Sequence, residues 1–401
     1  MNYEKIIELQ EFSKKTLLRE ELPSELGETL WQKHKEKVDV EFPSPKTEGK
    51  WELTSLGYVG FIALSNKVAI SLTPKVSLEN IFGMLEYAYD LKSFQFTEDI
   101  FGCSSIEEFY NRLVRILSNK VLSRIKQGLY GDYLPYTETL PYIRGRLDIS
   151  SFSSKPWKVK PVCSYHEHTR NVEDNQILTW TLKKIITTGI SDNDTLNLAR
   201  QAYRNLQRVV STKPIRPEEC IKRLYNRLND DYKPMHLLCR FFLENIGPTH
   251  LIGEKHINAF IVNMAQLYER FVAQWLQKNL PQNYILKAHE RVELPGENEV
   301  KLNIDLVLYN EKSQEPIAVL DTKYKVPQEF SRGDFNQITV YAISKNCDNA
   351  FLIYPLEPEK PLNTKVNNIH VRNLTFKLDG DLEENGKTFL DALLACTEKQ
   401  N

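Results

Sequence analysis

Two neighbouring strand patterns near residue 310 constrain the fold of this chain more than any other feature. In residues 301–308 (Lys-Leu-Asn-Ile-Asp-Leu-Val-Leu) the even positions are all aliphatic. Because side chains alternate between the two faces of a strand, this period places Asn303 and Asp305 together on the opposite face. Residues 317–320 are a continuous apolar run, which is typical of a buried central strand. The short loop between the two patterns predicts that these strands are neighbours in one sheet.

The second strand ends in charge, at Asp321-Thr322-Lys323. Asp321 and Lys323 are two residues apart, so both side chains leave the same face, and the hairpin brings Asp305 close to them. Two carboxylates and an ammonium group suit Mg²⁺, which uses one or two protein carboxylates and keeps several waters. The ion would polarise a phosphoryl oxygen and supply a hydroxide nucleophile, and Lys323 would orient or deprotonate that water and offset charge in the transition state.

The alternative interpretation of these three residues is a buried ion pair in a sheet. A second buried carboxylate without a partner would be costly, which favours the metal site. Four other triplets of the form [DE]-x-K occur in the chain, but none follows a buried apolar strand that is preceded by a strand with an Asp on its outer face.

Two predicted helices add candidate site residues. On the helix expected at 263–278, Glu269 falls at the rim of the apolar stripe, where a carboxylate would be partly buried. On the helix expected at 335–344, Gln337 and Tyr341 are i,i+4 neighbours that could contact a metal-bound water or a phosphate. The alternative for Glu269 is a solvated helix position. We interpret His289 and Glu290, at the start of a strand, as structural.

The pattern changes twice along the chain, which predicts three regions in a mixed α/β, multidomain protein. Residues 1–100 form a β-containing region, with a helix over 1–45 and a hairpin at 58–72. Residues 101–250 are mainly helical, interrupted by a loop or short hairpin at 134–148. Residues 251–401 form an α/β domain around a central mixed sheet.

Composition excludes several classes of protein. With 401 residues, 10% aromatic and 26% charged, the chain is neither disordered nor of low complexity. No stretch approaches the ~20 apolar residues of a membrane span, and residues 1–10 lack the apolar core of a secretory signal. Its 6 Cys are widely spaced without a C-x-x-C pair, so we expect neither zinc nor disulfides, and a cytoplasmic location.

Net charge is −1, so contact with nucleic acid must come from local patches. Arg144 and Arg146 flank a glycine and could contact DNA phosphate or a partner, or could simply be surface charges. A second patch is a stripe at i,i+4,i+8 on one helix face, which is either solvated or contacts phosphate; it consists of Arg200, Arg204 and Arg208. Two alternating histidines, His166 and His168, lack a third ligand and are expected on a loop or strand face.

Asp305, the Asp321-x-Lys323 triplet and the two flanking helices together resemble the core of PD-(D/E)XK nucleases. The first motif is Asn303-Ile304-Asp305 here, without the Pro-Asp that names the group. Between about residues 50 and 378 the chain also resembles the McrC family, the endonuclease subunit of McrBC-type modification-dependent restriction systems. The segments that carry this resemblance are Gly57–Ile62, Ile70–Val76, Met84–Ala88, Ile143–Asp148 and Asn175–Leu178.

The resemblance implies a partner, a ring-forming AAA+ GTPase of the McrB type that reads modified cytosine in double-stranded DNA. It implies that the N-terminal region docks into this ring and stimulates GTP hydrolysis, with contacts expected around Trp51–Lys75, and that the C-terminal domain cuts DNA with Mg²⁺. GTP would be bound by the partner, since Gly380–Thr388 has five residues between its glycines where a P-loop needs four. Two alternatives remain: a nuclease-fold adaptor that only activates the ring, and a stand-alone RecB-like nuclease.

Overall fold

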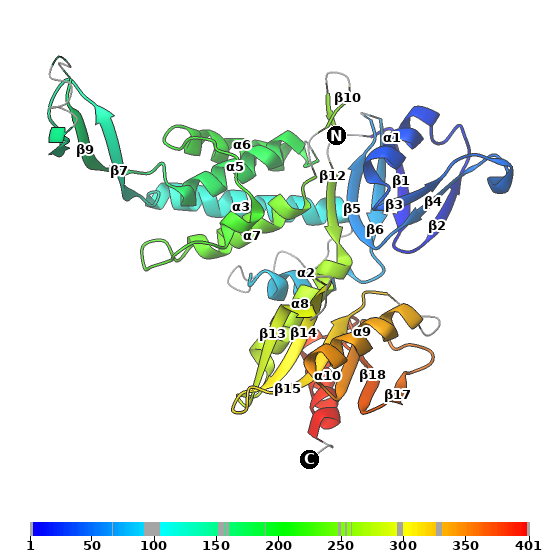
Figure 1. The fold of residues 1–401 in the computed structure, drawn as a ribbon. Coiled ribbons are helices and arrows are strands. Elements are labelled where there is room, and N and C mark those ends of the chain that lie inside the picture. The colour runs from blue at the N-terminus through cyan, green and yellow to red at the C-terminus, as the bar shows by residue number, and fades with distance from the viewer. Residues whose placement is uncertain are drawn as a thin grey trace. The chain divides into compact units, whose positions relative to one another are not determined.

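The computed structural model describes residues 3–65, 67–91, 105–150, 157, 160–188, 190–247, 250–252, 255–257, 259–294, 300–325 and 331–398. The chain forms two compact units, one of residues 110–246 and one that joins residues 2–109 with 247–401 (Figure 1). The predicted first and third regions therefore lie largely in a single unit, and the predicted helical region corresponds to the other. No helix in the described part of the chain combines the length and the apolar composition needed to cross a membrane.

The predicted helix over residues 1–45 is wrong for most of its length. The segment contains β1 (Lys5–Gln10), β2 (Lys14–Leu17), α1 (Ser24–His34) and β3 (Val38–Glu41). In β1, Ile7 and Leu9 are buried while Glu8 between them is exposed, which is the period of a strand and not of a helix. Parallel pairing with β6 (Val68–Thr73) holds β1 in place, and a partner so distant in the sequence leaves no local signal.

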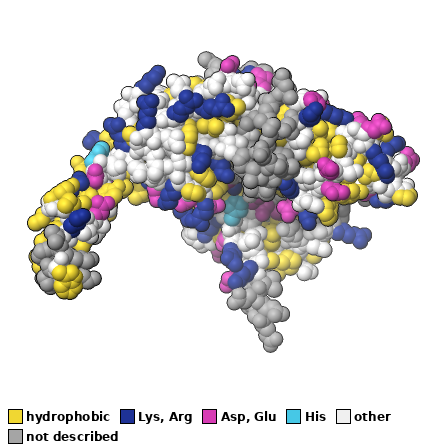
Figure 2. Space-filling model, turned by 90° about the horizontal axis from the view of Figure 1, so that it is seen from above, with side chains coloured by type: hydrophobic (Ala, Val, Ile, Leu, Met, Phe, Trp, Pro, Cys, Tyr) yellow, Lys and Arg dark blue, Asp and Glu magenta, His cyan; other side chains and the backbone are white. Residues whose placement is uncertain are grey.

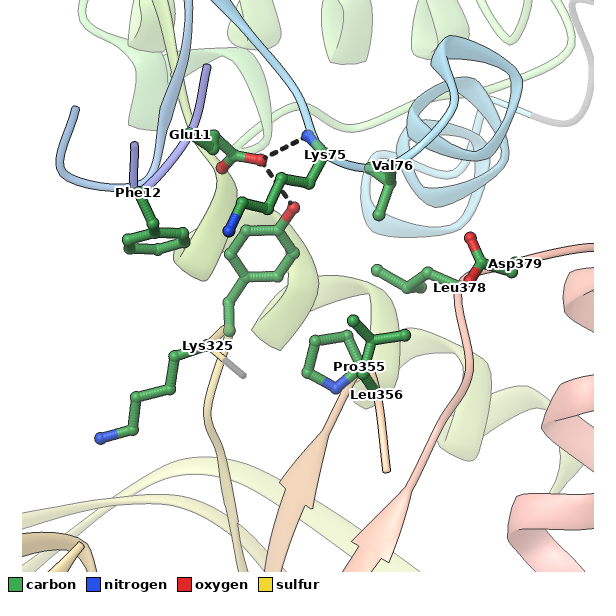
Figure 3. Close-up of a pocket in the computed structure, with 10 residues that line it drawn as sticks. Glu11, Phe12, Lys75, Val76, Lys325, Pro355, Leu356, Leu378 and Asp379 are labelled. Atoms are coloured by element: carbon green, nitrogen blue, oxygen red, sulfur yellow. Dashed lines mark hydrogen bonds between the residues drawn. The ribbon is translucent and has the colours of Figure 1, made fainter. Parts of the chain in front are cut away.

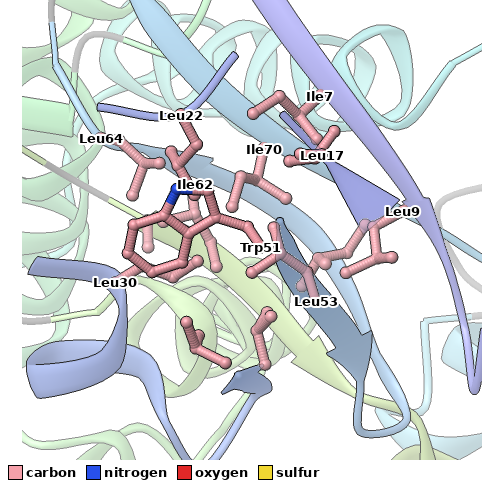
Figure 4. Close-up of a cluster of buried hydrophobic side chains, with 14 of the residues drawn as sticks. Ile7, Leu9, Leu17, Leu22, Leu30, Trp51, Leu53, Ile62, Leu64 and Ile70 are labelled. Carbon is pink, nitrogen blue, oxygen red and sulfur yellow. The ribbon is translucent and has the colours of Figure 1, made fainter. Parts of the chain in front are cut away.

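Two small sheets enclose the core of the N-terminal region (Figure 4). The first has the strand order β1-β6-β5-β12, and the second has the order β2-β4-β3. Their remaining strands are β4 (Trp51–Ser55), β5 (Tyr58–Ala63) and β12 (Ala259–Asn263). The predicted hairpin is confirmed, because β5 and β6 pair in antiparallel fashion. Trp51 is buried at the centre of the core among Leu53, Ile62 and Ile70, and Gly27 of α1 leaves room for its ring.

The described residues of the helical unit form several long helices and a protruding β-arm. The helices are α3 (Ile106–Gln127), α5 (Glu173–Thr188), α6 (Asn193–Gln207) and α7 (Tyr232–Asn245). The arm consists of β7 (Asp132–Thr139), β8 (Arg146–Leu147) and β9 (Val162–Thr169). The segment predicted as a loop or short hairpin contains β7 and β8, and both of these strands pair with β9 (Figure 1).

The C-terminal part of the other unit contains the predicted mixed sheet, in the order β13-β14-β15-β16-β18-β17. Its elements are α8 (Met264–Asn279), β13 (Tyr284–Leu294), β14 (Val300–Asn310), β15 (Pro316–Thr322), α9 (Arg332–Lys345), β16 (Asn349–Tyr354), β17 (Asn363–Val366), β18 (Ile369–Thr375) and α10 (Leu382–Glu398). β13, β14 and β15 are antiparallel neighbours, whereas β15, β16 and β18 run parallel. The crossover from β15 to β16 contains α9, which packs on these strands as a βαβ unit requires.

Helices outside the β15–β16 crossover also contact the mixed sheet. α8 contacts β13, β15 and α2 (Leu78–Ala88), and α10 contacts β18. In α10, Gly386 lies against Trp275 of α8, so closely that a Cβ there would be 2.2 Å from the indole ring. The segment that resembles a P-loop forms the start of α10, where the Asp381 carboxylate accepts backbone N–H groups of the first turn. The remaining described strands are β10 (His250–Ile252) and β11 (Lys255–Ile257).

Candidate functional site

Asp305 and Asp321 come together on neighbouring strands of the mixed sheet. Asp305 lies on β14 and Asp321 on β15. Leu306 pairs with Leu320 in the antiparallel register, so Asp305 and Asp321, one residue further along each strand, lie opposite each other. Asp305 Oδ2 accepts hydrogen bonds from the backbone N–H of Thr322 at 3.2 Å and from its hydroxyl at 3.4 Å. The first carboxylate is thus fixed to the strand that carries the second.

Lys323 joins this pair from the residue just beyond β15. Its Nζ lies 2.7 Å from Asp321 Oδ2 and donates a hydrogen bond to Gln337 Oε1 at 3.0 Å. Gln337 in turn donates from Nε2 to the Tyr341 hydroxyl at 2.8 Å. The structure therefore links four of the predicted residues in one chain of contacts between β15 and α9.

The Asp321 carboxylate is buried without full compensation. It is 1% exposed; Oδ2 forms an ion pair with the Lys323 Nζ at 2.7 Å, whereas Oδ1 has no hydrogen-bond partner in the described part of the chain. Burial, and then the nearby Asp305 charge, raise the pKa of Asp321 from 3.8 to about 8, although Lys323 opposes this. Burial lowers the pKa of Lys323, but the contact with Asp321 and the charges of Asp334 and Asp305 together outweigh it and leave that pKa above its ordinary value.

Glu269 reaches the same site from α8. Its side chain is 23% exposed, and Oε1 lies 3.2 Å from Nδ1 of His289 on β13. Burial, and then the charge of Asp305, raise the pKa of Glu269 to about 7. A carboxylate with such a pKa can accept and release a proton near neutral pH.

His289 is a residue that sequence reasoning treated as structural. The β13–β14 register places it across from Asp305, and its φ of 52° lies in the left-handed region that residues other than glycine seldom adopt. Strained backbone of this kind is concentrated at functional sites. Its neighbour Glu290 does behave structurally, because it is bound by Lys345 at 2.5 Å and by the Tyr309 hydroxyl at 2.8 Å. No local sequence pattern identifies His289 as a residue of the site. Only the β13–β14 register, which places it opposite Asp305, does so.

The two carboxylates fit a hard divalent cation. A buried oxygen without a partner is costly, and a bound cation would satisfy Oδ1 of Asp321. Within the described residues no group of three or more His, Cys, Asp or Glu side chains could hold a metal, so the ion would depend on Asp305, Asp321 and waters. That donor set suits Mg²⁺.

Within the described residues, the cysteines and the two alternating histidines form no second metal site. Cys163, Cys220, Cys239, Cys347 and Cys396 are free, and Cys103 lies outside the described residues. His166 and His168 are on β9, which agrees with the strand face expected for them.

Arg144 and Arg146 lie on the β-arm of the helical unit. The Arg144 guanidinium stacks 4.0 Å from the centre of the Tyr165 ring and pairs with Glu167 at 3.4 Å. Gly145 between them has a φ of 70°, and a Cβ there would be 2.5 Å from the backbone oxygen of residue 164, so the backbone approaches closely at this glycine. Large apolar side chains are exposed beyond the strands of the arm, as the space-filling view suggests (Figure 2); they are Tyr142, Ile143, Ile149 and Trp157.

The second basic patch lies on α6 and on Arg208, which caps its C-terminus. Leu196, Ala199, Ala202 and Leu206 form the buried face of this helix. Arg204 and Arg208 are exposed and Arg200 is half-buried, and Figure 2 shows Lys and Arg side chains on the outer surface of this unit. The stripe is thus available for contact with phosphate.

Comparison with known proteins agrees with the family that the motifs suggested. Residues 53–355 match the McrBC family, described as a component of the 5-methylcytosine restriction system, so the chain belongs to that family. It is 25% identical to the type IV methyl-directed restriction enzyme EcoKMcrBC of Escherichia coli K12 over 268 residues, which span 63% of this chain and 74% of that protein.

A solved structure shares the fold. It comes from a half-complex of the tetradecameric assembly of Thermococcus gammatolerans McrB AAA+ hexamers with bound McrC. The TM-score is 0.57 at 18% identity, and the alignment covers 98% of this chain and 100% of the other. At that identity the likeness concerns architecture only.

Proposed function

We propose that this chain is the Mg²⁺-dependent DNA endonuclease subunit of a GTP-driven restriction complex and that residues 251–401 are a PD-(D/E)XK domain. The observation that carries the proposal is Asp321: a buried carboxylate placed opposite Asp305, with Lys323 beside Oδ2 and no hydrogen-bond partner for Oδ1 among the described residues. The order of elements supports it, because the antiparallel strands that carry these residues lead through α9 into a parallel strand.

Each site residue has a chemical role in this proposal. Asp305 and Asp321 would hold Mg²⁺, which when bound lowers the pKa of a water and polarises the phosphate. Lys323 orients the attacking water and offsets the charge that develops on the phosphate oxygens. Glu269 accepts a proton, because its pKa lies near 7. Gln337 and Tyr341 hold the Lys323 ammonium in place.

The partner would be an McrB-like AAA+ GTPase ring whose hydrolysis the chain stimulates, and the substrate would be double-stranded DNA with modified cytosine. Family membership and the fold shared with the Thermococcus gammatolerans chain support this. Trp51 and Leu53, in the segment expected to touch the ring, are buried in the core and cannot contact it directly. The β-arm is a better contact surface, because exposed apolar side chains beside Arg144 favour a protein partner over DNA.

Two alternatives predict different behaviour. An inactive adaptor would activate the ring without a working site, yet Asp305, Asp321 and Lys323 are all present and in contact range of one another. A stand-alone nuclease would cut equally fast without the ring, and it would have no use for the large helical unit.

The test mixes the chain with its GTPase partner, methylated DNA, GTP and Mg²⁺, and measures DNA cleavage and GTP turnover together. Asp321→Ala is compared with the parent protein and with Asp391→Ala, which removes an exposed carboxylate on α10. We expect Asp321→Ala to abolish cleavage while GTP turnover stays at the parent level, and Asp391→Ala to change neither. Cleavage by Asp321→Ala at the parent rate would reject the metal site and leave the adaptor. Equal cleavage without the partner would favour the stand-alone nuclease.

A further inference from the structure

A second buried carboxylate lies at the end of β1, far from the site in sequence. Glu11 is 0% exposed, and its backbone bridges Ser55 of β4. Its Oε2 accepts the backbone N–H of Lys75 and the hydroxyl of Tyr324, each at 3.1 Å (Figure 3). Its Oε1 has no hydrogen-bond partner within the described residues. A carboxylate buried with one oxygen unsatisfied costs stability, so its presence calls for a reason other than stability.

Tyr324, the residue bound by Glu11, directly follows Lys323. β15 ends at Thr322, and beyond it the backbone N–H of Lys323 still donates to the oxygen of residue 353 at 2.8 Å. The Tyr324 ring is buried between two aromatic rings, with its centroid 5.9 Å from that of Tyr268 and 6.4 Å from that of Phe12. Tyr268 directly precedes Glu269 on α8. Tyr324 therefore follows one site residue, Lys323, in the chain and packs against the neighbour of another, Glu269.

Three consecutive side chains after β15 are therefore held from two directions. Lys323 is bound by Gln337, and Lys325 pairs with Asp334 at 2.5 Å, both on α9. Tyr324 between them is bound by the N-terminal sheet through Glu11. Lys323 and Lys325 are both held by α9. The hydrogen bond from the Tyr324 hydroxyl to Glu11 therefore ties this segment to the N-terminal sheet as well.

We propose that Glu11 is a positioning residue of the nuclease site, which by accepting the Tyr324 hydroxyl fixes the segment after β15 and so places the Lys323 ammonium beside Asp321. The inference rests on the proposed function for the role of Lys323. This role requires an acceptor oxygen at Glu11 and does not require its negative charge. A single oxygen, Oε2, accepts both hydrogen bonds. The N-terminal sheet thereby supplies part of the cutting site.

The experiment uses the full chain with its GTPase partner and measures single-turnover cleavage at saturating DNA. Glu11→Gln keeps the acceptor oxygen and should cut at the parent rate. Glu11→Met keeps the volume without the acceptor, and Tyr324→Phe removes the donor; each should cut about tenfold more slowly, because small displacements of catalytic groups are costly. The control is Tyr87→Phe, which removes another buried tyrosine hydroxyl bonded to a glutamate, Glu383.

Stability and additivity separate positioning from a general structural role. The unfolding temperatures of Glu11→Met and Tyr324→Phe should shift no more than that of Tyr87→Phe. Tyr87→Phe should nevertheless cut at the parent rate. The double variant Glu11→Met with Tyr324→Phe should be no slower than either single variant, because both remove the same contact. Parent-rate cutting by both single variants overturns the proposal, as does equal slowing by Tyr87→Phe.

A readout independent of cleavage is the rate at which an amine-acylating reagent modifies Lys323, followed by mass spectrometry. In the parent protein the Lys323 side chain is 18% exposed and paired, so modification should be slow. It should be several-fold faster in Glu11→Met and Tyr324→Phe, and unchanged in Glu11→Gln and Tyr87→Phe. If the parent protein cuts no DNA, the proposed function fails, and these rates still decide whether Glu11 positions Lys323. Equal rates in all variants would reject the positioning role.

Discussion

Replacing Asp321 by Asn should make the protein more stable while it abolishes cutting. Asn has the shape of Asp without its charge, and the Asp321 carboxylate is 1% exposed, with no hydrogen-bond partner for Oδ1 in the described part of the chain. Asp321→Asn ends the repulsion with Asp305, and Lys323 keeps its hydrogen bond to Gln337. Stability that is sacrificed for a functional site is recovered when the site is removed.

The size of the effect follows from the pKa of Asp321. Burial, aided by Asp305, raises it from 3.8 in the unfolded chain to about 8 in the folded one. The folded chain therefore keeps a proton that the unfolded chain releases, and stability falls as the pH rises between these values. A pKa difference of about 4 corresponds to about 5 kcal/mol of free energy of unfolding, reached in full only near pH 8 and above. The penalty is absent below about pH 4, where both states are protonated.

The assay is thermal unfolding of both proteins without divalent ions at pH 5 and pH 8. At about 2–4 °C per kcal/mol for a unit of this size, Asp321→Asn should unfold about 10 °C above the parent at pH 8. The gap should shrink to less than half at pH 5, where little of the penalty has developed. Adding Mg²⁺ at pH 8 should raise the midpoint of the parent and not that of the variant. A variant that unfolds at or below the parent temperature at pH 8 would refute this reasoning.

Two further predictions concern the proton acceptor and the basic stripe. Glu269→Gln should lower cleavage at pH 8 about a hundredfold and should remove the rise in rate that the parent shows near pH 7, because the pKa of Glu269 is about 7; an unchanged pH–rate profile would exclude Glu269. Replacing the three arginines of α6 by Gln should reduce the slope of log K against log salt for DNA binding by about 3 if each contacts a phosphate, and an unchanged slope would show a solvated face; these residues are Arg200, Arg204 and Arg208.

The sequence was informative where the structural period is short and local. The alternation in residues 301–308 and the apolar run after it predicted β14 and β15, and with them the meeting of Asp305 and Asp321. The i,i+4 spacing on α9 similarly predicted that Gln337 and Tyr341 lie together, since they are hydrogen-bonded at 2.8 Å.

Long-range pairing limited what could be predicted. Residues 5–10 form a strand because β6 pairs with them, and a partner so distant in the chain is invisible to a local pattern. His289 lies next to Glu269 only because of the β13–β14 register and its own unusual backbone. The contact between Glu11 and Tyr324 joins residues 313 positions apart, so no motif could have suggested it.

The placement of β12 has a consequence for the order in which the chain matures on the ribosome. β12 pairs with β5, yet about 200 residues, including the whole helical unit, are synthesised between them. At a synthesis rate of about 5–20 residues per second, one edge of β5 stays unpaired for roughly 10–40 seconds until β12 is made. During that interval the helical unit can already fold, whereas the N-terminal sheet carries an open edge that can pair with another nascent chain. Synthesis of β12 closes that edge, and the chain continues directly into α8 and the carboxylate of Glu269.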